Sequence, residues 1–167
     1  MLTIYGVAAL TNPARCGNLV VIRARKGYMT MTPPLVLGTL ESALYTDDTG
    51  RAVDFYHGII GLPVIGKASS RSVFFRVGAS VLILFNPAET EVHIPGSPYP
   101  VPRHGARGPG HYCFAVQPAS QDALRSHLIA NGIGIEADFR WSGGARSIYV
   151  RDPAGNSIEF ADPALWN

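Results

Sequence analysis

The sequence predicts an α+β protein of two tandem βαβββ modules, whose curved mixed sheets form a cleft. Three observations lead to this prediction. The order strand, amphipathic helix and three strands occurs twice between residues 37 and 163. A stretch rich in Pro and Gly separates the two copies. Of the 167 residues, 47% are hydrophobic and only 16% are charged, so the chain can bury a core.

Residues 1–36 form a predicted N-terminal extension, which does not enter the fold prediction. Its apolar run comes first and its positive charges follow, the reverse of the order in a secretory signal peptide. Met29 and Met31 stand just before Pro33 and Pro34 and are alternative starts of the protein. The extension is therefore expected to be loosely ordered or absent from the native chain.

The first module is predicted to span residues 37–86. Its segment LESALYTDDTGRAVDFYHGIIGLPV reads as a short strand, a turn with Asp and Thr that can cap a helix, an amphipathic helix and a second strand. The helix is expected to end near Gly58 to Gly61. The segments SRSVFFRVG and ASVLILFNP are rich in β-branched and aromatic residues, and they predict the last two strands.

Residues 87–110 are predicted to link the modules. Their many Pro and Gly residues exclude a central strand or a long helix. Loops of this length inside a compact protein are usually functional. We therefore expect this linker to act as a lid over the cleft.

The second module is predicted to span residues 111–163, followed by a tail at 164–167. Its first strand begins with GHYCFAV, so His111 stands where Glu41 stands in the first module. The two modules stay aligned along their helices, because Ala52 comes eleven residues after Glu41 and Asp122 comes eleven residues after His111. The segments ARSIYVRDP and NSIEFADP complete the module with two strands.

The turn before the last strand directs attention to Glu159. Asp152 to Asn156 read DPAGN, in which Pro presets φ for a tight turn and Gly155 accepts the left-handed position that closes it. In the strand that follows, Ile158 and Phe160 point to a core and Glu159 points the other way. Glu159 faces either water, as an ordinary carboxylate, or a cavity. If the two sheets close on each other, Glu41, His111 and Glu159 can converge there.

Composition narrows the classes of partner. The formal net charge of +2 is small and the Lys and Arg residues are scattered, so nucleic acid is not expected as a partner. No apolar run approaches the roughly 20 residues of a membrane-spanning helix, so no membrane is expected either. Cys16 and Cys113 form no disulfide framework, which favours the reducing cytoplasm.

The repeated plan, the opening GHYCFAV and the closing SIYVRDPAGNSIEF together resemble the vicinal oxygen chelate superfamily. This superfamily includes glyoxalase I, extradiol dioxygenases, fosfomycin-inactivating enzymes and bleomycin-resistance proteins. The resemblance covers about three quarters of the chain, from Leu37 to Pro163. It implies the fold, but no single reaction, because the fold carries many activities.

In superfamily members that bind a metal, the ligands come from the first and last strands of each module. Carried over, the resemblance implies Glu41, His111 and Glu159 as ligands, with a fourth position near Ile83, which cannot ligate. One imidazole and two carboxylates suit one divalent ion among Zn²⁺, Ni²⁺, Mn²⁺, Fe²⁺ and Mg²⁺. Open positions on such an ion would take a substrate with adjacent oxygens.

Three functions are compatible with this resemblance. The first is a glyoxalase-like lyase or isomerase, in which the metal stabilises an enediolate and a carboxylate such as Glu41 or Glu159 moves the proton. The second is an extradiol-type Fe²⁺ dioxygenase, although Glu41 replaces a histidine of that ligand set. The third is a metal-free protein that binds a small molecule or drug, as bleomycin-resistance proteins do.

Further residues complete the predicted site. His104 in the linker is a candidate mobile acid or base, because its ordinary pKa lies near neutrality. The candidate substrate contacts are Tyr45, Ser147, Tyr149, Arg103, Arg107 and Trp141. The resemblance also implies a homodimer. Whether Glu41 meets His111 within one chain or across the dimer interface is open at this point.

Overall fold

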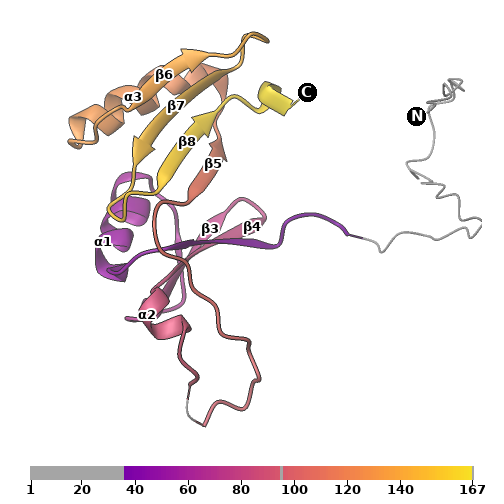
Figure 1. Cartoon of the computed structure of the whole chain (residues 1–167). Coiled ribbons are helices and arrows are strands. Elements are labelled where there is room, and N and C mark those ends of the chain that lie inside the picture. The colour runs from indigo at the N-terminus through magenta and orange to yellow at the C-terminus, as the bar shows by residue number, and fades with distance from the viewer. Residues whose placement is uncertain (1–35, 95, 167) are drawn as a thin grey trace, which may run out of the picture. The chain divides into compact units, whose positions relative to one another are not determined.

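The computed structural model describes residues 36–94 and 96–166, and in them it has two four-stranded mixed sheets (Figure 1). The predicted fold class, two βαβββ modules, is confirmed. The predictions for the N-terminal extension and for alternative starts at Met29 and Met31 lie outside the described residues, apart from residue 36. No helix in the described part is long and apolar enough to span a membrane.

The two sheets have the same topology. The first has the order β1-β4-β3-β2 and the second β5-β8-β7-β6. In each, the first and last strands of the module run parallel and the other pairs are antiparallel. The bounds are β1 Glu41–Tyr45, β2 Val64–Ile65, β3 Ser72–Val77, β4 Ser80–Phe85, β5 His111–Ala115, β6 Ala137–Arg140, β7 Arg146–Arg151 and β8 Ser157–Ala161.

The helices follow the first strand of each module. Helix α1 (Thr49–Val53) begins after Asp48, whose side chain accepts a hydrogen bond from the backbone N–H of Arg51 and caps the helix. It continues as a π-helical segment, Asp54–Ile59. Helix α3 (Gln121–Ala130) ends before Gly132, which has a φ of 75°. The remaining helical elements are α2 Pro87–Thr90, in the linker, and the 3₁₀ turns Pro118–Ser120 and Pro163–Trp166.

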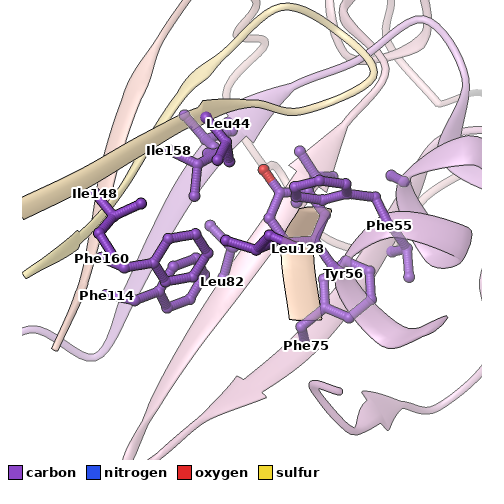
Figure 2. Packing of buried hydrophobic residues seen from close by; sticks show 14 residues of the cluster. Leu44, Phe55, Tyr56, Phe75, Leu82, Phe114, Leu128, Ile148, Ile158 and Phe160 are labelled. Carbon is purple, nitrogen blue, oxygen red and sulfur yellow. The ribbon is translucent and has the colours of Figure 1, made fainter. Parts of the chain in front are cut away.

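One hydrophobic core joins the helix-covered faces of both sheets (Figure 2). Phe75 and Leu82 come from the first sheet, Ile158 and Phe160 come from the second, and Tyr56 comes from the helical segment between β1 and β2. Burial of each such side chain contributes about 1.5–3 kcal/mol. Since alternate strand residues point to opposite faces, the residues between these core positions point away from the core.

A buried polar junction also links the modules through the turn before β8. The Asn156 side chain accepts a hydrogen bond from the Gly110 N–H at 2.7 Å and donates one to the Tyr45 carbonyl at 3.1 Å. It also donates to Asp152, which accepts a second bond from the hydroxyl of Tyr56 at 2.8 Å. Burial, reinforced by the Asp152 carboxylate, raises the pKa of Tyr56 well above its ordinary value.

The turn itself has the predicted form. Gly155 has a φ of 85° and donates its N–H to the Asp152 carbonyl at 3.0 Å. A Cβ at Gly110 would lie 2.7 Å from Leu44 Cδ2, so a side chain there would displace Leu44. The turn and Gly110 therefore fix where β5 and β8 begin.

Candidate functional site

The open face of the second sheet carries a histidine and a buried carboxylate in contact. His111 begins β5, and Glu159 lies in the adjacent strand β8, opposite Cys113. The Nε2 atom of His111 is 3.3 Å from Oε2 of Glu159. The His111 side chain is 52% exposed, whereas that of Glu159 is only 7% exposed. Glu159 therefore lies under the imidazole and does not face bulk water.

A hydrogen-bond relay holds the other oxygen of Glu159. The Ser147 hydroxyl, in β7, donates to Glu159 Oε1 at 2.5 Å and is fully buried. The Trp141 indole N–H donates to the same hydroxyl oxygen at 2.9 Å. Because Trp141 uses the acceptor side of the hydroxyl, Ser147 directs its proton to the carboxylate. The relay fixes Oε1 and leaves Oε2 facing His111.

Two side chains near Glu159, Tyr149 and Cys113, are neutral at ordinary pH. Burial, with a further contribution from the charge of Glu159, raises the pKa of Tyr149 to about 12. The same two causes raise the pKa of the Cys113 thiol to about 12. The Tyr149 ring stacks on His111 at a centroid distance of 6.2 Å and on Phe139 at 5.9 Å. An aromatic wall thus stands beside the His111–Glu159 pair.

Glu41 occupies the equivalent position on the first sheet, but it does not join this pair. Glu41 begins β1 as His111 begins β5, and Ile83 lies opposite Ala43 as Glu159 lies opposite Cys113. The open face of each sheet points away from the shared core. Within residues 36–94 and 96–166, no three His, Cys, Asp or Glu side chains gather where they could hold a metal.

His104 of the linker lies against the open face of the first sheet. Its Nδ1 atom is 2.9 Å from the hydroxyl oxygen of Tyr45, and its ring contacts Phe85 edge-on at a centroid distance of 4.6 Å. Its backbone N–H donates to the Thr90 carbonyl at 3.2 Å. Two predicted site residues, Tyr45 and His104, therefore form a pair of their own.

The two linker arginines lie in different places. Arg107 forms an ion pair with Glu91 at 2.6 Å. It lines a cavity of about 320 Å³ beside Asp47 and Asp48. Arg103 lines a separate cavity of about 240 Å³, together with Arg71 and His104. Arg103 and Arg107, both predicted to contact the substrate, thus line different cavities.

A family model, the glyoxalase/bleomycin resistance protein/dioxygenase superfamily, matches residues 38–160. The chain belongs to this superfamily. Among solved structures, a lactoylglutathione lyase from Agrobacterium tumefaciens is 40% identical, with a TM-score of 0.74 over 81% of this chain and 98% of its own. A search of the curated proteins found no match.

Two further solved structures share the fold of this glyoxalase-superfamily chain. The fosfomycin resistance protein FosX from Mesorhizobium loti is 16% identical, with a TM-score of 0.54 over 77% of this chain and 93% of its own. TioX from Micromonospora sp. ML1 is 21% identical, with a TM-score of 0.58 over 75% of this chain and 98% of its own. At these identities the similarity concerns the fold alone.

The His111–Glu159 pair has the spacing of two donors to one ion. Donor atoms that bind a metal at about 2.0–2.2 Å from adjacent positions lie roughly 3.0–3.5 Å apart. The separation of Nε2 and Oε2, 3.3 Å, falls in this interval. The hydrogen bond from Ser147 resembles the outer-sphere support that metal-binding carboxylates usually receive. The pair could therefore hold a divalent ion together with further donors.

Sequence reasoning missed two residues of these faces. Phe139, in β6, extends the aromatic wall, and its alternation with Asp138 gave only a weak signal. Arg71 lies just before β3, and its guanidinium donates to the Glu89 carbonyl in the linker. No local pattern could have predicted that contact, because it depends on how the linker returns over the sheet.

Proposed function

We propose that this protein is a divalent-metal-dependent lyase or isomerase that acts on a small substrate with adjacent oxygens. The observation that supports this most directly is the His111–Glu159 pair, in which a buried carboxylate keeps one oxygen beside an accessible imidazole. Membership of the superfamily and the 40% identity to a lactoylglutathione lyase support the same reaction class.

In this proposal His111 and Glu159 hold the ion, and Ser147 keeps the carboxylate oriented toward it. A bound divalent ion would supply a Lewis acid for two adjacent substrate oxygens and for the negative charge that develops when a neighbouring carbon loses its proton. Tyr149 and Phe139 exclude water from one side of the substrate. Trp141, which is 42% exposed, lies at the edge of this wall.

The third donor in this proposal is Glu41 of a second copy of the chain. Glu41 and the His111–Glu159 pair lie on open faces that both point away from one shared core. A homodimer in which the first sheet of one chain faces the second sheet of the other would bring the three donors together. Such a dimer leaves Ile83 at the fourth position, where it contributes no ligand.

The facing first sheet would then also supply the groups that move the proton. Glu159 is suited to a fixed role, because Ser147 occupies one of its oxygens. Glu41 is exposed and has no such partner among the interactions of the described residues. His104 is held by Tyr45 through Nδ1, which leaves Nε2 free to accept or donate a proton. We assign proton transfer to Glu41 and His104.

Metal content of mixed dimers tests this proposal. The Glu41→Gln chain and the Glu159→Gln chain are each prepared alone and then co-expressed with different purification tags, and the metal is measured by plasma mass spectrometry. Each variant alone is expected to lose its metal. In the mixed dimer, one site combines both defects, while the other combines an intact Glu41 with an intact Glu159. We therefore expect half of the wild-type metal content to return.

Enzymatic activity is then measured in the same samples. The assays follow the formation of S-lactoylglutathione from glutathione and methylglyoxal, and the turnover of other substrates with adjacent oxygens. A mixed dimer without metal would contradict a site shared between chains. If wild-type protein takes up none of Zn²⁺, Ni²⁺, Mn²⁺, Fe²⁺ and Mg²⁺, the metal-dependent function is wrong. A metal-free binding protein would then be the better explanation.

A further inference from the structure

A cavity under the linker, which we call the linker pocket, lies beside the candidate acid or base His104. It has a volume of about 240 Å³. Its walls include Arg71, Phe85, Thr90, Tyr99, Arg103 and His104. Phe85 belongs to β4 and Thr90 to α2, so the pocket is built where the linker lies against the first sheet. Neither the superfamily match nor the His111–Glu159 pair assigns a role to it.

The pocket is positively charged. Arg71 and Arg103 both contribute to its walls, and its described lining residues include no Asp or Glu. The carboxylate of Glu91 lies outside the pocket and is engaged by Arg107 at 2.6 Å. Two guanidinium groups without a facing carboxylate favour an anion, because Arg offers several N–H donors to carboxylate oxygens.

The rim of the pocket is apolar. Three of its large hydrophobic side chains are exposed to solvent: Tyr99 is 71% exposed, Val101 64% and Val92 56%. Phe85 also lines the pocket and contacts His104, with ring centroids 4.6 Å apart. A ligand with an aromatic or branched apolar body would cover these side chains and gain hydrophobic free energy.

We propose that the linker pocket binds a small carboxylate with an apolar body, through Arg103 and Arg71. Because His104 lines the pocket and also contacts Tyr45, a molecule held there by its anionic end would present its other end to the open face of the first sheet. This pocket is therefore the recognition subsite for the substrate, a step that rests on the proposed function. The binding of an anion does not rest on it.

Two matched probes test the charge preference directly. Binding of 4-fluorobenzoate and of the neutral 4-fluorobenzamide to the full chain is followed by ¹⁹F NMR, in EDTA and again after metal loading. We expect the carboxylate to bind about tenfold more tightly than the amide in both conditions, because charge-assisted hydrogen bonds are the stronger ones. Raising the salt concentration should weaken the binding of 4-fluorobenzoate but not that of 4-fluorobenzamide.

Variants locate the site. Arg103→Gln should abolish the preference for the carboxylate, and Arg103→Lys should restore part of it. Arg107→Gln is the matched control, because Arg107 belongs to the same linker but lines another cavity. Equal affinity for both probes, or an equal loss in the Arg107→Gln protein, would overturn the proposal. The Arg103→Gln protein could also lose the carboxylate preference together with a change in its sedimentation coefficient. That result would overturn the proposal as well, because the pocket rim would then be a contact between two copies of the chain.

The measurements in EDTA and after metal loading distinguish this inference from the proposed function. Anion binding that depends on Arg103 in a protein that takes up no metal would retain the linker pocket and remove the metal-dependent function. A protein that loads metal but shows no carboxylate preference would retain that function and remove the pocket.

Discussion

The open faces of the two sheets occupy equivalent positions in a repeated fold, yet they are supported differently. On the second sheet, Glu159 is buried and receives a hydrogen bond from Ser147. On the first sheet, the equivalent position holds the apolar Ile83. There the polar groups are Tyr45 and His104, and His104 comes from the linker. One copy of the repeat thus holds a carboxylate in place, while the other is covered by a segment inserted between the modules.

The two faces therefore differ in what holds their polar groups in place. A buried carboxylate needs hydrogen-bond partners, and neighbouring strands of one sheet can provide them at fixed distances. A residue on a linker is less constrained and can move with the segment that carries it. We infer that the second sheet provides the fixed part of the site and the first sheet the adjustable part.

The largest expected effect comes from breaking the junction that fixes both sheets. Asn156→Ala should lower the free energy of unfolding by about 3 kcal/mol, because it leaves the Gly110 N–H and the Tyr45 carbonyl without this partner and removes one of the hydrogen bonds that Asp152 accepts. Urea denaturation measures this change. Asn131→Ala, at an exposed helix end, is the control and should cost far less. A similar loss in both variants would show that the junction has no special weight.

The next effect sharpens the difference between the two faces. Ser147→Ala should lower the affinity for the proposed metal about 10- to 100-fold, as expected when a hydrogen bond to a ligand is lost. Competition with a metal-binding dye measures the affinity. Trp141→Phe should produce a smaller loss, because the indole acts only through the Ser147 hydroxyl. Unchanged affinity in Ser147→Ala would mean that Glu159 needs no support.

The strand pattern explains how much of this arrangement could be predicted. The repeat, the turn at Gly155 and the outward direction of Glu159 all follow from local rules, because alternation and turn chemistry act over a few residues. The contact between His111 and Glu159 needs one further assumption, that the first and last strands of a module are neighbours.

The rest depends on contacts between distant segments. Asn156 reaches the Tyr45 carbonyl across 111 positions, and no local pattern signals that bond. The linker was predicted as a lid, and its Arg103 and Arg107 line separate cavities, with Arg107 paired to Glu91. The separation of Glu41 from Glu159 within a chain follows from the shared core, which strand alternation alone does not specify.

A smaller effect concerns the ion-pair cluster next to Ser147. Arg146 donates to Asp138 at 2.7 Å, and this contact, with help from Arg125, lowers the pKa of Asp138. A lowered pKa stabilises the fold above the unfolded value of about 3.9 and loses that contribution as the pH falls through the folded value. Asp138→Asn should therefore cost about 1 kcal/mol at pH 7 and progressively less below pH 4.

Thermal unfolding of the wild-type and Asp138→Asn proteins across this pH range measures the difference. Asp122 is the other partner of Arg146, and the Asp122 side chain is 89% exposed. Asp122→Asn should therefore change stability little at any pH. A gap between the wild-type and Asp138→Asn proteins that widens toward acid would contradict the sign of the pKa shift.

The smallest effect on stability is expected on the adjustable face. Tyr45→Phe removes the contact between the Tyr45 hydroxyl and His104, and should lower the free energy of unfolding by less than about 1 kcal/mol because the contact is only partly buried. The linker should nevertheless respond, since His104 then keeps its backbone bond to Thr90 and its ring contacts with Phe85 and with the ring at position 45, but loses its side-chain hydrogen bond. Cleavage by trypsin after Arg103 and Arg107 should become faster in the native protein, whereas His93→Gln, which leaves this contact intact, should be cleaved at the wild-type rate. Equal cleavage rates in wild-type and Tyr45→Phe proteins would mean that Tyr45 does not hold the linker, and the contrast between a fixed and an adjustable face would lose its main support.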